Sequence, residues 1–328
     1  MKQDNLRGRS ILVALIAAVL LVSVSGLTIG HTLPTAYATK PGNDNNNNPA
    51  LPQNTGTNGP NNSNGDGRIG NGIESGSSSD RDASDFSTQR LTALDMEGAA
   101  TAAAAASNAA CGQVVSGVVN LTANLNCSSG DGIIVGGPNT VINMNGFSIT
   151  GPGQDSSKVA IMVPNVDNVV VNGPGSISNF QAAVLLTGTN GFKINSVIIS
   201  NNQIGTFMTG AENAQVQQNI IQGNSIGVAS HSSSGAAIDS NLMSGNLLAG
   251  VTFVNTRQSA IDMNIIVGSQ NGVFLDGQSS QNTISANNVL ENVIDLNNAN
   301  GLPTNINANQ YVDNNCETSN PSGLCIGR

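Results

Sequence analysis

Acid–base or metal chemistry in this sequence would depend on very few side chains. The stretch from Cys111 to Arg328 contains eleven Asp and Glu, four Lys and Arg, and one His. Two of the carboxylates, Asp239 and Asp262, stand in the similar tetrapeptides Ile-Asp-Ser-Asn and Ile-Asp-Met-Asn. Two neighbouring carboxylates can hold Ca²⁺, and at about 5 Å they can act as the acid and base of a retaining glycosidase. A solvated acidic pair without a function is the third interpretation.

The other charged residues are weaker candidates for a site. In the repeat described next, His231 and Asp276 occupy the same position two units apart. That separation is about 10 Å, which is too far for a direct hydrogen bond. Arg257 and Glu212 are also two units apart, and Lys193 has no acidic neighbour at its position. We expect His231 and Arg257 to be surface residues without a catalytic role.

These side chains are positioned by a repeat that begins at Asp131. Its unit of 22 to 27 residues carries an apolar residue, two spacers and an Asn. Apolar residues alternate over short stretches bounded by Gly, Asn and Ser, which is typical of short strands and turns. Short strands with a near-constant period predict a parallel β-solenoid of about eight coils, stacked about 4.8 Å apart. Asp239 and Asp262 would then lie on adjacent coils with both side chains pointing outward.

Stacking of the coils also explains why the Asn recurs. A buried Asn needs partners for its amide group, and an Asn at the same position of the next coil supplies them. Asn also suits the left-handed turn expected there. One coil has Val197 at this position, so we expect a local weak point. The predicted ladder consists of Asn145, Asn172, Asn219, Asn241, Asn264, Asn287 and Asn309.

The repeat and the segments at its two ends resemble a known superfamily. The opening runs from Cys111-Gly112-Gln113 to Leu125-Asn126-Cys127, the first coil reads Asn143-Met144-Asn145-Gly146-Phe147-Ser148-Ile149-Thr150-Gly151, and the closing segment runs from Asn315-Cys316 to Leu324-Cys325. This pattern resembles the right-handed parallel β-helix proteins of the pectate-lyase-like superfamily, which includes NosD-like and carbohydrate-binding or sugar-hydrolase β-helix domains. The resemblance covers 111–328. It implies an all-β, right-handed parallel β-helix.

The resemblance does not by itself imply an enzyme. Polygalacturonase-like members carry Asn-Thr-Asp, Asp-Asp and Gly-His-Gly elements, and mannuronan-epimerase-like members carry Asp-Pro-His. Pectate lyases combine a Ca²⁺ carboxylate cluster with a catalytic Arg. None of these strings occurs in the sequence, and its two Tyr residues, Tyr37 and Tyr311, offer little for stacking on sugars.

Four Cys residues allow three disulfide connectivities. In a solenoid, Cys111 and Cys127 precede the first Asn-bearing coil, and Cys316 and Cys325 follow the last. About 35–40 Å would separate these two pairs, whereas a disulfide spans at most about 7 Å between Cα atoms. We therefore predict Cys111–Cys127 and Cys316–Cys325. Each bond would fasten one end of the stack, where strand edges are unpaired.

The N-terminal segment indicates export. Basic residues Lys2, Arg7 and Arg9 precede an apolar run, and Ala36-Tyr37-Ala38 fits a cleavage site. The run continues without charge to Gly30, so a retained anchor is the alternative to a cleaved signal. The expected organisation is a signal peptide or N-terminal anchor at 1–38, a disordered Asn/Gly/Ser-rich linker at 39–95, an Ala-rich linker or short capping helix at 96–110, and the β-helix at 111–328.

Charge and location narrow the class of partner. The net charge is −9 with only 11 Lys and Arg, so nucleic acid and anionic membranes are not expected partners. Our main hypothesis is an extracellular or cell-surface module that interacts with polysaccharide or glycan, or is structural, without catalysis. No cofactor is expected, and Ca²⁺ is the candidate ion for the Asp pair. The alternatives are a polysaccharide lyase, epimerase or hydrolase that uses Asp239 and Asp262, and a NosD-like role in periplasmic metal assembly, for which soft ligands are scarce.

Overall fold

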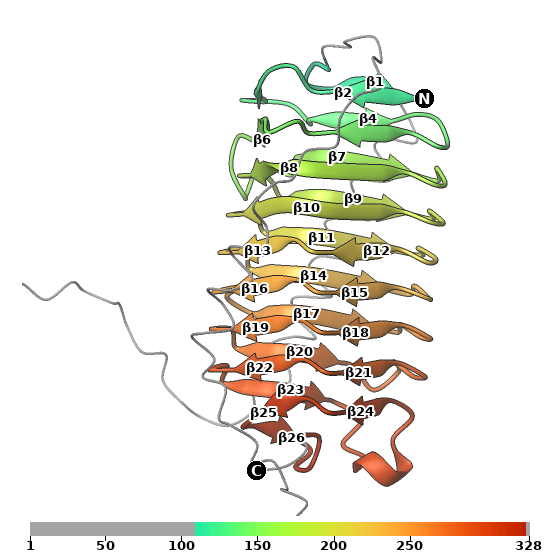
Figure 1. The fold of residues 1–328 in the computed structure, drawn as a ribbon, viewed down its shortest axis with the longest axis vertical. Coiled ribbons are helices and arrows are strands. Elements are labelled where there is room, and N and C mark those ends of the chain that lie inside the picture. The colour runs from blue at the N-terminus through green and yellow to red at the C-terminus, as the bar shows by residue number, and fades with distance from the viewer. Residues whose placement is uncertain (1–108, 326–328) are drawn as a thin grey trace, which may run out of the picture. The chain divides into compact units, whose positions relative to one another are not determined.

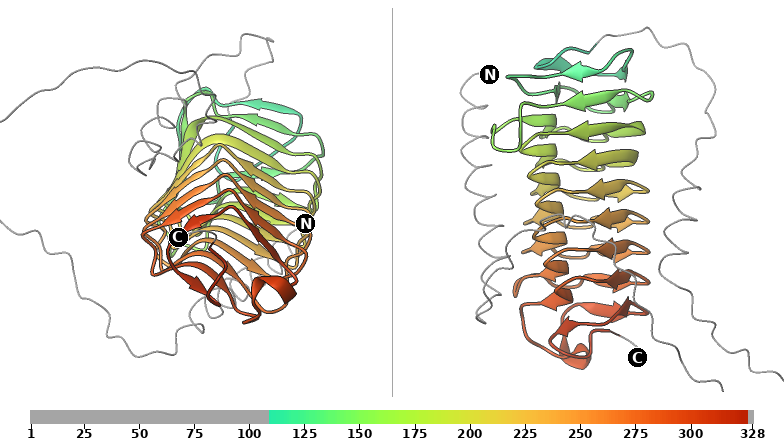
Figure 2. Two further views of the ribbon diagram at one scale, coloured as in Figure 1. Left: turned by 60° about the horizontal axis from the view of Figure 1, so that its bottom comes forward. Right: turned by 90° about the vertical axis from the view of Figure 1, so that its left-hand side faces the viewer.

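The computed structural model describes residues 109–325, which form a parallel β-solenoid of about nine turns (Figure 1). The coils stack in chain order, as the two further views in Figure 2 also show. The predicted parallel β-solenoid is therefore confirmed. The predicted signal or anchor, the linker and nearly all of the Ala-rich segment lie outside the described residues. No helix within 109–325 is long and apolar enough to cross a membrane.

Each full coil contributes strands to three faces. The first face is a 10-stranded parallel sheet of β1 (Gln113–Val115), β4 (Ile133–Val135), β7 (Val159–Pro164), β9 (Ala182–Thr187), β11 (Ile204–Thr209), β14 (Ile226–His231), β17 (Ala249–Val254), β20 (Asn271–Leu275), β23 (Ile294–Asn298) and β26 (Ser319–Asn320). The other two faces share a 16-stranded sheet, because β8 (Val170–Ser178) and β10 (Lys193–Ser200) run across both.

The remaining strands divide between the second and third faces. The second face contains β2 (Val118–Asn120), β5 (Val141–Asn143), β12 (Gln215–Gln217), β15 (Ala237–Asp239), β18 (Ala260–Asp262), β21 (Thr283–Ser285) and β24 (Gln310–Val312). The third face contains β3 (Leu125–Asn126), β6 (Ser148–Thr150), β13 (Ile220–Gln222), β16 (Leu242–Ser244), β19 (Ile265–Val267), β22 (Asn288–Leu290) and β25 (Asn315–Cys316). A 3-10 turn, η1 (Thr304–Ile306), precedes β24.

The core is a continuous column of inward apolar side chains. On the second face, each strand from β5 to β21 places one β-branched residue inward, and the register aligns these residues from coil to coil. They are Ile142, Val171, Ile194, Val216, Ile238, Ile261 and Ile284, and none has exposed surface. The inward residues of each coil pack against those of the coils before and after it. The core is therefore shared by the whole stack and does not belong to any single coil.

An Asn ladder runs through the corner between the second and third faces. Asn219, Asn241, Asn264 and Asn287 are each at most 1% exposed. The Nδ2 of each donates to the Oδ1 of the Asn in the next coil, at 2.9 to 3.1 Å. The residue before each Asn has the left-handed conformation, with φ of 51° to 57°. The Asn side chain therefore braces the turn while its neighbour takes the left-handed backbone.

Three of the seven predicted ladder residues lie elsewhere, and these predictions were wrong. Asn309 pairs with Asn282 at 2.9 Å, and Asn314 is the residue that continues the ladder after Asn287. The 27-residue step of this coil includes the η1 turn, so counting 22 residues stops five short. Asn172 belongs to the outward face of β8.

Asn145 lies two residues before the ladder position of its coil, which Phe147 occupies. Its Nδ2 donates to the backbone carbonyl of Leu121 at 3.1 Å. Val197 stands at the start of the ladder rather than inside it, because its backbone N–H donates to Asn219 Oδ1 at 3.0 Å. Its apolar side chain is 1% exposed and packs in the core.

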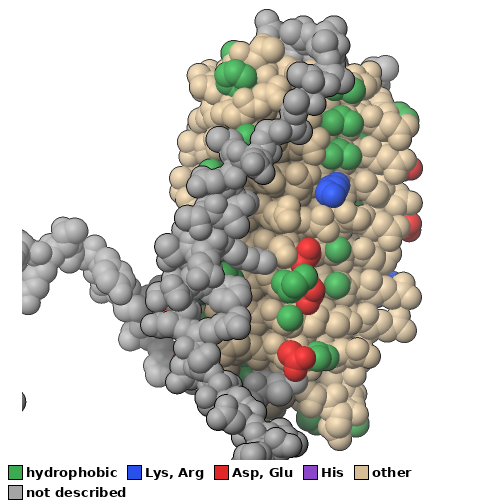
Figure 3. Space-filling view, viewed as in Figure 1, with side chains coloured by type: hydrophobic (Ala, Val, Ile, Leu, Met, Phe, Trp, Pro, Cys, Tyr) green, Lys and Arg blue, Asp and Glu red, His purple; other side chains and the backbone are tan. Residues whose placement is uncertain are grey.

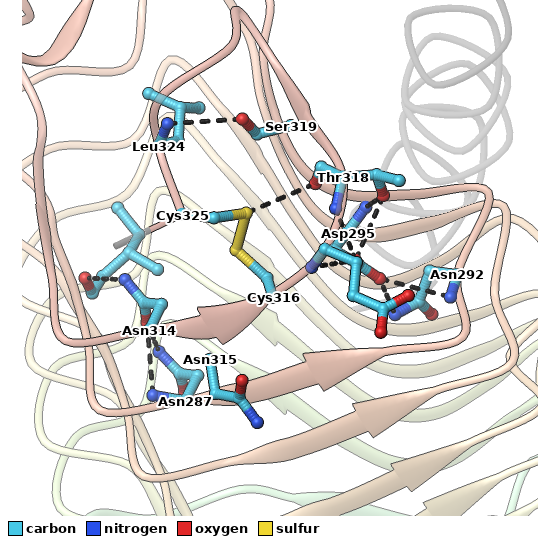
Figure 4. The surroundings of a disulfide bond; sticks show 12 residues. Asn287, Asn292, Asp295, Asn314, Asn315, Cys316, Thr318, Ser319, Leu324 and Cys325 are labelled. Atoms are coloured by element: carbon cyan, nitrogen blue, oxygen red, sulfur yellow. Dashed lines mark hydrogen bonds between the residues drawn. A yellow bond between two sulfur atoms is a disulfide. The ribbon is translucent and has the colours of Figure 1, made fainter. Parts of the chain in front are cut away.

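The two disulfides close the two ends of the solenoid. Cys111 is bonded to Cys127 with 5.5 Å between their Cα atoms, and Cys316 is bonded to Cys325 with 5.3 Å. These are the pairs that the sequence predicts. The second bond joins β25 to the end of the described chain, next to the last coil (Figure 4).

Candidate functional site

The second face presents one polar column on its outer side. Inward residues such as Val216 and Ile238 alternate with outward ones, so the residue after each inward residue points to solvent. Register aligns these outward residues over eight consecutive coils. They are Asn120, Asn143, Asn172, Asn195, Gln217, Asp239, Asp262 and Ser285. We call this set the outer polar column.

In the first half of the outer polar column, the Asn side chains form hydrogen bonds with one another. Asn143 Nδ2 donates to Asn120 Oδ1 at 2.8 Å, Asn172 to Asn143 at 3.0 Å, and Asn195 to Asn172 at 3.0 Å. These amides form a second Asn ladder on the outside of the solenoid. This ladder was not predicted, although Asn recurs at the same position in four units of the sequence.

The second half of the column keeps hydrogen-bonding groups free. Asp239 and Asp262 are direct register partners on adjacent coils, as the sequence predicts. Ser240 Oγ donates to Asp239 Oδ1 at 2.9 Å, and Ser285 Oγ donates to Asp262 Oδ1 at 2.7 Å. Within 109–325 no hydrogen bond holds the Oδ2 of either carboxylate or the Gln217 amide. We call Gln217, Asp239 and Asp262 the polar patch.

Small side chains flank the polar patch on the same strands. Ala237 and Ala260 occupy the outward positions two residues before Asp239 and Asp262. The side chains that border the carboxylates on this side are therefore small. Figure 3 shows how few charged side chains this side of the molecule carries: red acidic and blue basic groups are scattered, and most of the surface is uncharged.

The structure does not bring His231 and Asp276 together. His231 is the register partner of Val254 in the next coil. Asp276 follows Leu275, the partner of Phe253 in the coil after that, so His231 and Asp276 are two coils apart, as predicted. Burial lowers the pKa of His231, and the nearby Asp276 carboxylate opposes this effect. Asp276 Oδ1 accepts the backbone N–H and the hydroxyl of Ser279 at 2.8 and 2.6 Å, which fixes a turn. Asp276 thus has a structural contact instead of a catalytic one.

Glu212 and Arg257 lie on one column of isolated bridges with Ser234 between them. They are therefore two coils apart, as predicted. Lys193 is paired in register with Val170 and Gln215 and so has no acidic partner in its column. Glu212, Arg257 and Lys193 therefore form no catalytic arrangement with one another within 109–325.

The sequence of this chain matches the model of a known protein family. The sequence model of the family described as "Periplasmic copper-binding protein (NosD)" matches residues 124–323. No curated protein sequence matches the chain.

Three solved structures illustrate the fold-level likeness. DFA-IIIase from Arthrobacter chlorophenolicus A6 is 14% identical with a TM-score of 0.41, over 60% of this chain and 55% of the enzyme. The surface protein and adhesin PfbA of Streptococcus pneumoniae is 13% identical with a TM-score of 0.34, over 62% and 76%. The tailspike protein of E. coli bacteriophage HK620 is 8% identical with a TM-score of 0.39, over 61% and 48%.

The donor groups within 109–325 do not fit a copper ion, the metal in the family's description. Copper is held by thiolate, thioether or imidazole groups. All four Cys are in disulfides, His231 is the single described imidazole, and no three His, Cys, Asp or Glu residues of this part of the chain cluster. Met144, Met208 and Met243 are wholly buried in the core. No step of a mechanism is therefore assigned to copper.

Proposed function

The chain belongs to the NosD family of periplasmic proteins, and from this premise we propose that it is an exported β-helix that binds polysaccharide along its second face. Two disulfides suit an oxidising compartment outside the cytoplasm. The sequence supports the same location, with basic residues, an apolar run and a candidate cleavage site at its start.

The outer polar column is the observation that carries this proposal. Its side chains repeat at about 4.8 Å along a straight, regular face. Sugar hydroxyl groups both donate and accept hydrogen bonds, and so they match the amide and carboxylate groups of Gln217, Asp239 and Asp262. A polymer can contact several coils at once, which raises the overall affinity of weak individual contacts.

The charge and the aromatic content of the face indicate the type of glycan. Asp239 and Asp262 repel polyanions, so the favoured ligand is an uncharged polysaccharide. Tyr311, the single Tyr within 109–325, is 7% exposed, and burial raises the pKa of its phenol. It belongs to the last coil's interior and offers no stacking platform. Binding is therefore expected to depend on hydrogen bonds instead of aromatic contacts.

The test compares two Gln residues on one coil. Gln217→Ala is expected to weaken binding of an uncharged polysaccharide about fivefold, since a hydrogen bond to a sugar contributes about 1 kcal/mol. Gln222→Ala removes an exposed Gln from the third face and should leave the dissociation constant unchanged. Affinity electrophoresis against a panel of neutral polysaccharides measures both. Equal losses in the two variants, or no binding to any polymer, would contradict the proposal.

The adjacent carboxylates also favour a second candidate, a polysaccharide-active enzyme. Their spacing of about one coil is close to that of the two carboxylates in retaining glycosidases. An Asp239→Asn/Asp262→Asn variant would then lose all turnover while it still binds the polymer. Release of reducing ends or of unsaturated sugars, measured for both proteins, distinguishes this enzyme from a binding module.

The same pair is our candidate for weak Ca²⁺ binding. Two carboxylates supply fewer than the six to eight oxygen ligands that Ca²⁺ takes, so we expect a dissociation constant in the millimolar range. At 10 mM Ca²⁺ the melting temperature should rise by about 2 °C through binding linkage. The double variant Asp239→Ala/Asp262→Ala should lose this rise, and Mg²⁺ should not produce it. A rise that the double variant keeps would place the ion elsewhere.

A further inference from the structure

Two tripeptides in the first coil fit the acceptor pattern for N-linked glycosylation, which is Asn, any residue except Pro, and then Ser or Thr. They are Asn120-Leu121-Thr122 and Asn126-Cys127-Ser128. The similar Asn320-Pro321-Ser322 is excluded by its Pro. An acceptor Asn lies at the protein surface, where a transferase reaches its side-chain amide. The structure separates the two tripeptides by this criterion.

Asn120 is already part of the outer polar column. Its side chain is partly buried, and its Oδ1 accepts the Nδ2 of Asn143 at 2.8 Å. Leu121, the middle residue of the tripeptide, is 1% exposed, and its backbone N–H donates to the carbonyl of Asn143 at 2.9 Å. The first tripeptide is therefore held against the next coil, which makes Asn120 a poor acceptor.

Asn126 is exposed on the outer side of the third face. In β3, Leu125 is the register partner of the wholly buried Ile149 and packs against the core, so Asn126 points outward. Within 109–325 no hydrogen bond holds the Asn126 amide, and Ser128 is also exposed, at the start of the bend 128–130. Cys127 between them is 2% exposed and is bonded to Cys111, which fixes the backbone of the tripeptide. Both polar side chains of the second tripeptide are therefore accessible.

The outward column that continues from Asn126 consists of hydroxyl side chains. Register aligns Asn126 with Thr150, Ser178 and Ser200 on the next three coils. Each of the three follows a wholly buried Ile in its strand, so its side chain points outward, and each is partly exposed. Within 109–325 no hydrogen bond holds their hydroxyl groups, which can both donate to and accept from sugar hydroxyls. We call Thr150, Ser178 and Ser200 the hydroxyl column.

We propose that Asn126 carries an N-linked glycan whose first sugars lie along the hydroxyl column. This inference rests on the export of the chain under the proposed function, because this modification is made on exported proteins. In the transfer, Asn126 Nδ2 forms a bond to the anomeric carbon of a lipid-phosphate-linked oligosaccharide. The bond between that carbon and the phosphate oxygen breaks, and the lipid phosphate leaves with the electron pair. Nδ2 loses one proton to a base of the transferase.

A glycan at this position leaves the polar patch free. Asn126 belongs to the third face of the first coil, whereas Gln217, Asp239 and Asp262 belong to the second face. Register places the coil of Gln217 four coils after that of Asn126, which is about 19 Å along the solenoid. The attached glycan and a bound polysaccharide would therefore occupy different faces.

Mass spectrometry of the full chain, purified from the cells that make it, tests the modification. Chymotryptic fragments should carry a glycan mass on Asn126 and none on Asn120. Asn126→Gln and Ser128→Ala should each remove the glycan, whereas Asn120→Gln and Ser128→Thr should retain it. Exported protein with an unmodified Asn126 would overturn the inference and leave the proposed function standing. A chain that stays in the cytoplasm without a glycan would contradict both.

A double-mutant cycle in protein from the same cells tests where the glycan lies. Asn126→Gln should lower the melting temperature of the otherwise unchanged chain by about 2 °C, because hydrogen bonds between the sugars and the hydroxyl column are lost. In a Thr150→Val/Ser178→Ala background, which lacks the two nearest hydroxyl groups, Asn126→Gln should cause no shift. A shift of equal size in both backgrounds would place the glycan away from the hydroxyl column and overturn this part of the inference.

Discussion

Replacement of Asn264 by Ala is expected to lower the free energy of unfolding by about 4 kcal/mol. The side chain is 1% exposed, and its Oδ1 accepts the backbone N–H and Nδ2 of Asn241 at 2.9 and 3.0 Å. Its Nδ2 donates to the carbonyls of Ile238 and Asp262 and to Asn287 Oδ1, at 2.8 to 3.0 Å. Ala replaces none of these bonds, and each buried group without a partner costs about 1–3 kcal/mol.

Urea unfolding of the variant and the parent measures this effect. Asn195→Ala is the matched control, because Asn195 belongs to the outer polar column and donates one side-chain hydrogen bond, to Asn172. Its loss should cost about 1 kcal/mol or less. If both variants lose the same stability, the inner ladder contributes no more than the outer one, and burial is not what makes it strong.

Replacement of Asp295 by Ala is expected to cost about 3 kcal/mol, concentrated in the last two coils. Asp295 is 1% exposed on β23, and its carboxylate accepts hydrogen bonds from both sides (Figure 4). Oδ1 accepts the backbone N–H and Nδ2 of Asn292 at 3.2 and 3.0 Å. Oδ2 accepts the backbone N–H of Glu317 and Thr318, both at 2.9 Å, and the Thr318 hydroxyl at 3.1 Å.

Amide hydrogen exchange locates the damage, and urea unfolding gives its size. Protection should fall for residues after about 290 and remain in the middle coils, because repeats depend mainly on their neighbours. Asp155→Ala removes an exposed carboxylate and should change stability by less than about 0.5 kcal/mol. Uniform loss of protection along the whole chain would show that the last coils are not an independent cap.

The sequence predicts the solenoid because its period is direct evidence of stacking. It predicts the register correctly where units have 22 or 23 residues, from Asn219 to Asn287. It fails where an extra turn lengthens the coil before Asn309. A neighbouring corner of that coil also carries an Asn, so spacing alone cannot distinguish an insertion from a true ladder position.

The candidate site was predictable only in part. Adjacency of Asp239 and Asp262 follows from the register, whereas the unpaired state of the Gln217 amide depends on which neighbours bond to one another. The outward apolar residues of the first face, such as Met162, Leu185 and Phe207, have a signal in the sequence that no prediction above used. Val159-Ala160-Ile161-Met162-Val163 is apolar throughout, and such a run is typical of a strand covered on both faces. Asp295 has no comparable signal, because one buried carboxylate does not repeat.

The ladder from Asn219 to Asn264 makes the middle of this protein a one-dimensional lattice whose unit cell is a single coil. Each unit offers the same acceptor to the unit before it and the same donor to the unit after it. Deletion or duplication of one unit would therefore leave every contact at the two disulfide-bonded termini intact. Genes with different numbers of units would encode surfaces whose lengths differ by whole multiples of about 4.8 Å.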